Sequence, residues 1–149
     1  MYDHILLPTD GTSLSERAVE QAIALARKLG AKVSALHVVG QHYPHFTDEG
    51  YDVIEIRTLR ERFRDAEAAN AERILEAVRA AAEAQGVACD TLTVAGESVH
   101  EKILEQADKL KCDLIVMASH GRMGLDALLM GSETAKVVTH SKIPVMVCH

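Results

Sequence analysis

The chain contains 149 residues, carries a formal net charge of -6 and is 48% hydrophobic but only 3% aromatic, with no tryptophan. This length fits one domain spanning residues 1–149, and its core must be aliphatic because aromatic side chains are so few. The acidic balance and the lack of a basic run argue against nucleic acid and anionic membranes as partners.

The cysteines and the amino-terminal residues indicate the compartment. Cys89, Cys112 and Cys148 are odd in number and form no Cys-x-x-Cys pair, which is typical of reduced structural thiols. No run approaches 18 apolar residues, and the first eight residues contain no basic segment followed by a long apolar one. We therefore expect a soluble, cytoplasmic protein without an export signal.

Hydrophobic periodicity predicts strands and helices in strict alternation. Short apolar or β-branched runs predict strands, whereas apolar residues at intervals of three and four predict helices. The expected strands are residues 3–8, 32–39, 89–95, 113–118 and 144–148. The expected helices are residues 14–29, 52–84, 98–110 and 132–140. The polar residues 40–51 have the composition of a long loop.

Helix starts are predicted from capping residues. Three capping-box patterns, in which Ser or Thr precedes Glu by three positions, occur at Ser13, Thr58 and Ser98. Ser132 is the expected N-cap of the last helix.

This alternation predicts an α/β fold, namely a single open five-stranded parallel sheet with right-handed crossovers and helices on both faces. With strand order 3-2-1-4-5, the order reverses between strands one and four, and ligands of such sheets bind at that point beside the carboxyl ends of the strands. The loops that meet there are Pro8–Gly11 and Ser119–Arg122, with the end of the second strand beside them.

Residues 114–136 combine a strand, a glycine-containing loop and a helix start. Gly121 and Gly124 follow the apolar run, and Gly131 and Ser132 open the next helix. Glycines permit close backbone approach, and the first amides of a helix are unpaired donors, so the combination suits a phosphate group. The alternative is purely structural, with the glycines forming a turn and Ser132 capping the helix.

Several motifs in this order resemble the universal stress protein family. They are Pro8-Thr-Asp-Gly after the first strand, Ala118-Ser-His-Gly121, Gly131-Ser132 after nine further residues, and the closing Ser141-Lys-Ile-Pro-Val-Met-Val. The resemblance covers the whole chain. It implies a Rossmann-like fold of the adenine nucleotide α hydrolase type, and a stress-response protein that binds ATP, ADP or AMP, with Mg²⁺ accompanying a triphosphate.

The resemblance also implies roles for individual residues. Gly121, Gly131 and Ser132 would hold phosphates, Asp10 would lie near the ribose or a metal ion, and the backbone of Val38 would meet the adenine. The full expected set is Pro8, Thr9, Asp10, Val38, Ala118, Ser119, His120, Gly121, Arg122, Gly131, Ser132, Glu133 and Thr134. Arg122 and His120 could supply charge-assisted contacts, or Arg122 could be a solvated loop residue.

The sequence departs from the family at one position. The nucleotide-binding branch carries Gly-x2-Gly-x9-Gly-[Ser/Thr], and here Ala118 replaces the first glycine. A methyl group there is tolerated where the backbone is β-like, or it weakens triphosphate binding and leaves a mono- or diphosphate as the better fit.

Enzymatic motifs are missing from the sequence. It contains neither Gly-x-x-x-x-Gly-Lys-[Ser/Thr] nor Gly-x-Ser-x-Gly, so we expect no catalytic residues and at most slow ATP hydrolysis. A phosphoacceptor receiver is disfavoured because Asp10 stands alone after the first strand. The remaining alternative is a homodimeric stress scaffold that binds no nucleotide.

Histidines and the last strand raise two further questions. His42 and His45 have no neighbours at zinc-ligand spacing, so no metal site is expected, while His4 and His37 lie on strands and should be satisfied core or edge residues. The last strand is expected at a sheet edge, and the resemblance implies a homodimer through Val145, Met146 and Val147. We expect proline at Met146 to produce a monomer.

Overall fold

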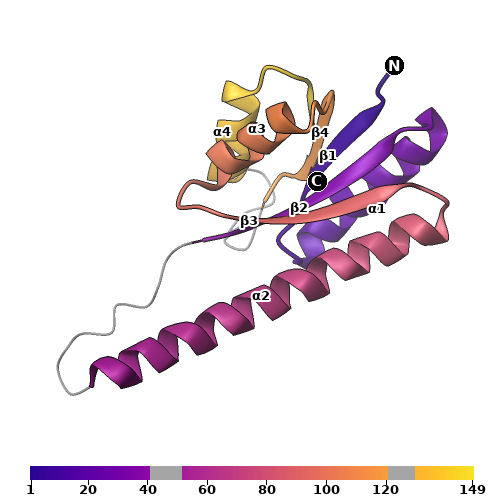
Figure 1. The fold of residues 1–149 in the computed structure, drawn as a ribbon. Coiled ribbons are helices and arrows are strands. Elements are labelled where there is room, and N and C mark those ends of the chain that lie inside the picture. Colours follow the sequence, from indigo (N-terminus) through magenta and orange to yellow (C-terminus); the bar gives the residue numbers. More distant parts are fainter. Residues whose placement is uncertain (41–51, 121–129) are drawn as a thin grey trace.

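The computed structural model describes residues 1–40, 52–120 and 130–149, and it contains one five-stranded sheet flanked by helices (Figure 1). The strands are β1 (His4–Pro8), β2 (Lys32–Val39), β3 (Cys89–Ala95), β4 (Leu114–Ala118) and β5 (Val145–Cys148). The helices are α1 (Ser13–Leu29), α2 (Val53–Ala84), α3 (Val99–Lys109) and α4 (Ser132–His140). These bounds differ from the predicted ones by a residue or so at most ends.

The sheet order is β3-β2-β1-β4-β5 and every pairing is parallel. Both features confirm the prediction. Because each described helix follows a strand of a parallel sheet, α1, α3 and α4 begin at the edge formed by the carboxyl ends of the strands, whereas α2 begins beyond this edge. The strand order reverses between β1 and β4, whose pairing joins Ile5 to Leu114 and Leu6 to Ile115.

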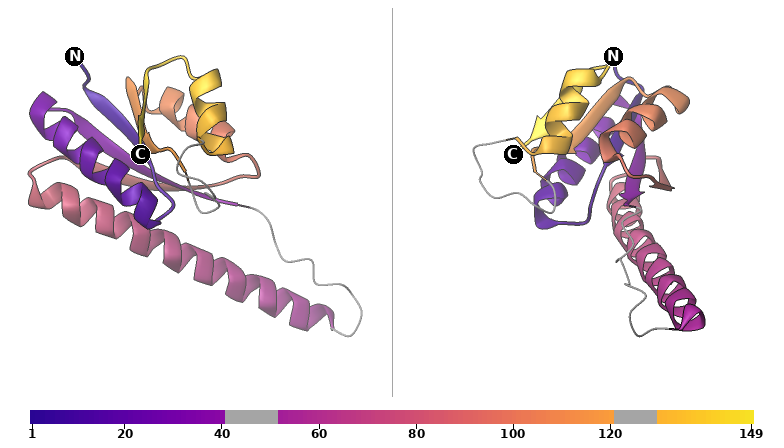
Figure 2. Two further views of the ribbon diagram at one scale, coloured as in Figure 1. Left: turned by 180° about the vertical axis from the view of Figure 1, so that it is seen from behind. Right: turned by 90° about the vertical axis from the view of Figure 1, so that its left-hand side faces the viewer.

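Helices cover both faces of the sheet, as Figures 1 and 2 show. Alternate strand residues point to opposite faces, so Ile5 and Leu7 pack in the core with α1 and α2, whereas Leu6 packs with α3 and α4. The central strands β1 and β4 are buried along their full length. The first part of α2 extends beyond the sheet, and Val53 at its start is 74% exposed.

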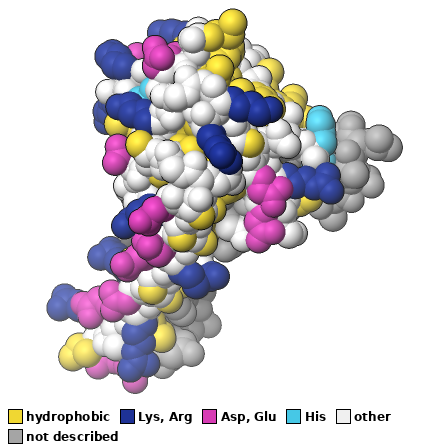
Figure 3. All heavy atoms as spheres, turned by 90° about the vertical axis from the view of Figure 1, so that its right-hand side faces the viewer, with side chains coloured by type: hydrophobic (Ala, Val, Ile, Leu, Met, Phe, Trp, Pro, Cys, Tyr) yellow, Lys and Arg dark blue, Asp and Glu magenta, His cyan; other side chains and the backbone are white. Residues whose placement is uncertain are grey.

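Charged side chains of both signs mix over the face drawn in Figure 3, including the extended part of α2. This distribution provides no broad surface of a single sign on that face.

The helix starts differ from the predicted capping pattern. Helix α1 is capped by Thr12 rather than Ser13, because Asp10 holds the Thr12 hydroxyl and the helix begins one residue earlier. Helix α2 begins after Asp52, whose amide donates to Glu55, so Thr58 lies inside the helix and its hydroxyl donates to the Ile54 carbonyl.

Of the last two caps, one has the predicted position without the predicted bond and the other is displaced by one residue. Ser98 is the N-cap of α3, but its side chain forms no cap bond and its Oγ lies 3.2 Å from Nδ1 of His100. Gly131 is the N-cap of α4, and Ser132 is the first helical residue. The prediction that Ser132 caps this helix is therefore wrong, because Gly131 already adopts the extended backbone that precedes the helix.

Candidate functional site

The turn after β1 is held by bonds within the chain. Thr9 donates its amide to the Leu36 carbonyl at 2.9 Å, and its own carbonyl lies 2.9 Å from Nδ1 of His37. Its hydroxyl donates to Ser15 Oγ at 3.1 Å. Thr9 is buried, so its polar groups serve mainly to join β1, β2 and α1.

Asp10 builds the start of α1. Its Oδ1 accepts from the Thr12 amide at 3.0 Å and from the Thr12 hydroxyl at 2.6 Å, which is an Asx-turn. Gly11 between them has φ +76°, and a Cβ there would lie 2.6 Å from the Ile74 side chain. Asp10 is only half-buried, so its carboxylate is both a structural acceptor and accessible at the reversal point.

Val38 presents its peptide group to the space beyond β1. On the β3 side of the strand, the Val33 amide donates to the Ala88 carbonyl, and the Gly96 amide donates to the Val39 carbonyl. Alternate residues of a strand direct their N–H and C=O groups to opposite neighbours, so those of Val38 face the β1 side. The β1–β2 register ends at Pro8 opposite Leu36. A donor and an acceptor of Val38 thus lie just past the end of β1.

Helix α4 is attached directly to the end of β4. The Gly131 amide donates to the Ser119 carbonyl at 2.6 Å, and the Thr134 hydroxyl donates to the Ala118 carbonyl at 2.9 Å. A Cβ on Gly131 would lie 3.2 Å from the Ser119 carbonyl oxygen and 3.4 Å from Cα of His120. Since φ of Gly131 is -58°, any residue can adopt this backbone, and glycine is favoured here by the close approach to Ser119 and His120.

Ala118 is the last residue of β4, and its side chain is buried in the core shared with α1 and α2. Helix α4 lies on the opposite face of the sheet, where Val137 packs with Ile103. The methyl group that distinguishes Ala118 from glycine therefore lies on the face of the sheet that α1 covers. The backbone at this position is a β-strand.

Glu133 is directed to the neighbouring helix. Its Oε2 accepts from the His100 amide at 2.8 Å and lies 3.1 Å from Nδ1 of the same histidine, while Lys136 donates to Oε1 at 3.2 Å. Burial opposes ionisation of this carboxyl, but the bonds from His100 and Lys136 outweigh it and lower the pKa of Glu133. Glu133 thus acts as an anionic cap for α3.

The starts of the described helices differ in the side chains that bind their first amides. Thr12 caps α1, Glu55 binds the N-cap amide of α2, and Glu133 binds the first turn of α3. Helix α4 begins at Gly131 without a side-chain cap among the described residues. The first amides of a helix lack partners within it and lie at the positive end of its dipole, so this helix start is suited to an external anion.

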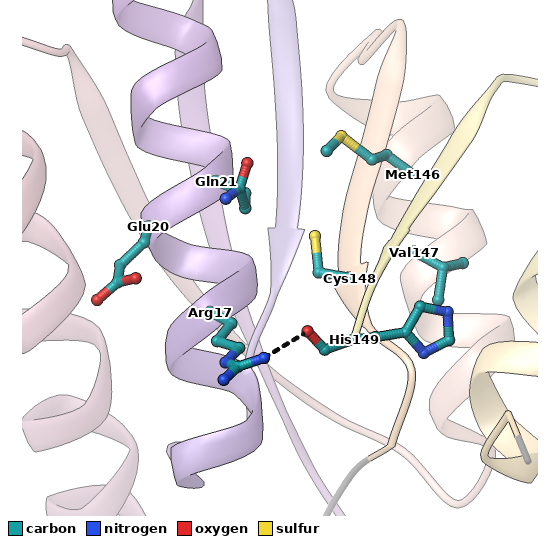
Figure 4. Close-up of a pocket in the computed structure, with 7 residues that line it drawn as sticks. All are labelled: Arg17, Glu20, Gln21, Met146, Val147, Cys148 and His149. Atoms are coloured by element: carbon teal, nitrogen blue, oxygen red, sulfur yellow. Dashed lines mark hydrogen bonds between the residues drawn. The ribbon is translucent and has the colours of Figure 1, made fainter. Parts of the chain in front are cut away.

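One hollow lies elsewhere, between α1 and β5 (Figure 4). It measures about 350 Å³, and its lining includes Arg17, Gln21 and Met146 but none of the predicted site residues. The described residues contain no group of three or more His, Cys, Asp or Glu side chains placed to hold a metal ion.

Comparison with known proteins identifies the family. A model of the universal stress protein family matches residues 1–149. The chain belongs to this family. Universal stress protein MJ0531 of Methanocaldococcus jannaschii is 34% identical over 148 residues, covering 99% of this chain and 82% of that protein.

Solved structures of universal stress proteins share the fold. UspA from Lactobacillus plantarum has a TM-score of 0.82 at 25% identity, covering 99% of this chain and 98% of its own. A universal stress protein in complex with cAMP has a TM-score of 0.71 at 25% identity, covering 99% of this chain and 97% of its own. In the present universal stress protein, no helix among the described residues is long and apolar enough to cross a membrane.

The structure brings together most of the residues predicted from the sequence of this universal stress protein. Those of the β1 turn, the end of β2, the end of β4 and the start of α4 all lie along one edge of the sheet. Gly121, Arg122 and Gly124 lie outside the described residues, as do His42 and His45.

Two contacts at this edge were not predicted. His100 bonds to Glu133, and His37 bonds to Thr9. Both pairs are distant in sequence, and no local spacing marks them. His4 and His37 were expected to be satisfied, and each has a buried partner, Ser34 and Thr9 respectively.

Proposed function

We propose that this universal stress protein binds an adenine nucleotide where the strand order reverses, with a phosphate at the start of α4 and the base at the end of β2. The observation that carries this proposal is the helix start at Gly131, where no described side chain accepts from a first-turn amide. At the starts of α1, α2 and α3, by contrast, Thr12, Glu55 and Glu133 respectively accept from a backbone amide. The cAMP complex of a relative that is 25% identical supports an adenine nucleotide as the ligand class.

The start of α4 would bind the phosphate through its first amides. Phosphate at a helix N-terminus gains hydrogen bonds and a favourable dipole together. The missing Cβ of Gly131 lets the start of α4 lie close to the backbone of Ser119 and His120 at the end of β4. The nearby carboxylate of Glu133 is held by His100 and Lys136, which reduces its repulsion of a bound anion.

The end of β2 would bind the adenine. The Watson–Crick edge of adenine presents an amino donor beside a ring-nitrogen acceptor, which matches a backbone C=O and N–H pair. Val38 directs such a pair past the last residue of β1. Asp10, at the turn between the two positions, would lie near the ribose hydroxyls or a metal ion that accompanies a triphosphate.

The position of the Ala118 methyl group suggests that alanine at this position of the family motif is compatible with nucleotide binding. It packs on the α1 side of the sheet, away from the helix that would hold the phosphate. We therefore propose that Ala118 does not prevent binding of ATP, ADP or AMP, and that any preference among them arises from other residues.

Calorimetric titration with ATP, ADP, AMP and cAMP, each with and without Mg²⁺, tests this proposal. Gly131→Val should abolish the heat of binding. Its Cβ alone would lie 3.2 Å from the Ser119 carbonyl oxygen, so the branched side chain should push the start of α4 away from the end of β4. Thr139→Ala, which removes a bond to the Ala135 carbonyl at the other end of α4, is the matched control and should bind normally.

Thermal unfolding of each variant would separate loss of binding from loss of folding. If the unmodified protein binds none of the four nucleotides and releases none on denaturation, the nucleotide-free scaffold is the better description. If Gly131→Val folds and binds normally, the phosphate is not at α4.

We also propose that the protein forms a homodimer through the outer edge of β5. This strand is at the end of the sheet order, and Met146 is 36% exposed. Ile115 and Ser119 donate to the carbonyls of Pro144 and Cys148, so even-numbered residues of β5 bond to β4. The outward N–H and C=O groups belong to Val145 and Val147.

This register changes the substitution that tests dimerisation. Proline at Met146 would remove a bond to β4 and damage the sheet, whereas Val147→Pro removes an outward amide. Val147→Thr keeps that amide and the side-chain shape, so it serves as the control. Light scattering should give a monomer for Val147→Pro and a dimer for Val147→Thr, and equal masses would exclude this interface.

A further inference from the structure

Two histidines from neighbouring helices have their rings close together outside the proposed nucleotide site. His100 lies in the first turn of α3 and His140 is the last residue of α4. Their ring centroids are 6.1 Å apart, and the ring planes are inclined by 36°. The side chain of His100 is 18% exposed and His140 is exposed, so solvent reaches the pair.

Hydrogen bonds determine which nitrogen of each ring can bind a further partner. Nδ1 of His100 lies 3.1 Å from the Glu133 carboxylate, and Nδ1 of His140 lies 2.9 Å from the Lys136 carbonyl. The Glu133 carboxylate and the Lys136 carbonyl can only accept, so each Nδ1 carries the hydrogen, and the Ser98 hydroxyl 3.2 Å from Nδ1 of His100 can accept as well. In the neutral ring, the lone pair therefore resides on Nε2 in both histidines.

This arrangement matches the surroundings of metal-binding histidines. Such rings characteristically donate their second nitrogen to a carboxylate or backbone carbonyl, which fixes the tautomer and makes the ligand nitrogen more basic. Glu133 supplies a carboxylate to His100, and Lys136 supplies a carbonyl to His140.

The separation of the rings is compatible with one shared ion. With a metal–nitrogen bond of about 2 Å and a ring radius of about 1.2 Å, two ligating imidazoles have centroids at most about 6.4 Å apart. The observed 6.1 Å lies within that limit. A smaller angle at the metal requires only a small movement of His140, which is exposed at the end of its helix.

We propose that His100 and His140 bind a divalent transition-metal ion such as Zn²⁺ or Ni²⁺ through their Nε2 atoms, with water completing the coordination. Imidazole is a preferred ligand of these ions. Glu133 orients His100 and is itself neutralised by Lys136, so it supports the site without joining the ligand set. The bound ion would connect the start of α3 to the end of α4, in addition to the Glu133 contact.

Calorimetric titration of the full chain with Zn²⁺ tests this site. His100→Gln and His140→Gln should each lower the affinity by at least about tenfold, because each removes one of two protein ligands. The double variant should bind Zn²⁺ no more tightly than either single variant, because both protein ligands are then missing. His149→Gln removes an exposed histidine from the far side of β5 and should leave binding unchanged.

Nitrogen NMR of the histidine rings gives an independent readout. Zn²⁺ should shift the Nε2 resonances of His100 and His140 and leave their Nδ1 atoms protonated. Unchanged Zn²⁺ affinity in both single variants, or no shift at either Nε2, would overturn the proposal. Nucleotide titration of His140→Gln should be normal, so failure of the metal site can be distinguished from failure of the nucleotide site.

Discussion

Helices α3 and α4 lie side by side on one face of the sheet and start at the same edge, but their first turns have different partners (Figures 1 and 2). The start of α3 receives the Glu133 carboxylate at the His100 amide. The start of α4 has Gly131 and no side-chain cap among the described residues. The first turn of α3 already binds a carboxylate, whereas the first amides of α4 can bind the anionic group of a ligand.

The largest effect is expected when a carboxylate is introduced at the first residue of α4, where it would compete with the phosphate. Ser132→Asp places a negative charge in the first turn, where it favours the helix dipole by about 0.3–1 kcal/mol but repels phosphate. We expect nucleotide affinity to fall at least about tenfold, or about 1.4 kcal/mol, with no loss of thermal stability. Calorimetry and thermal unfolding measure the two effects.

Ser132→Asn is the control for this charge, since it has the same shape without the negative charge. Its affinity should stay well above that of Ser132→Asp, and the gap should narrow at high salt as the charges are screened. Equal affinities of the two variants would mean that the phosphate does not approach α4.

Removing the Glu133 carboxylate that binds the first turn of α3 should have a smaller effect, and it should lower the stability of the fold. Glu133→Gln loses the charge that binds the His100 amide and Lys136, and because the side chain is partly exposed we expect about 1 kcal/mol of destabilisation. Glu133 has a lowered pKa, so its contribution is present above pH 4.5 and is lost as the pH falls further.

Urea unfolding at several pH values measures this contribution. The difference between the unmodified protein and Glu133→Gln should be greatest near pH 7 and shrink in acid. A difference that does not vary with pH would show that the ionised carboxylate is not what stabilises α3.

At the opposite edge of the sheet, the buried His4 should have a smaller effect on the free energy of unfolding, and this effect should appear near neutral pH. His4 is buried and bonds to Ser34 at 2.7 Å, and burial together with the charge of Lys32 lowers its pKa below 6.5. The unfolded chain binds this proton more readily, so His4 reduces stability as the pH falls through 6.5.

His4→Gln should remove this dependence, because glutamine can still reach Ser34 but does not titrate. We expect the stability of the unmodified protein to fall between pH 7 and pH 5 by less than about 1.4 kcal/mol per pH unit, and that of the variant to fall less steeply. Parallel stability curves in this range would contradict the assignment to His4.

The fold was predictable from the sequence because its signals are local. Alternating apolar runs placed the strands, and the buried runs at β1 and β4 predicted central strands. Helix starts were harder, because capping depends on which of several adjacent polar residues the turn holds. The Asx-turn formed by Asp10 selected Thr12 over Ser13, and the capping-box spacing does not include that contact.

The site was predictable in position but not in its internal bonding. Motif order placed Asp10, Ala118 and Gly131 at one edge, and the sheet topology brings them there. The role of Glu133 was missed, because its partner His100 is 33 residues away in the chain. Such long-range pairs depend on how two helices pack, which the periodicity of either helix does not specify.

Amide NMR during a nucleotide titration tests the central claim most directly. We predict that AMP or ATP shifts the amide resonances of Ser132, Glu133 and Thr134 at the start of α4 the most, because these donors would bind the phosphate. The amide of His100, already bonded to Glu133, should change far less. Larger shifts at His100 than at Ser132–Thr134, or no shifts at millimolar nucleotide, would contradict the claim that α4 holds the phosphate.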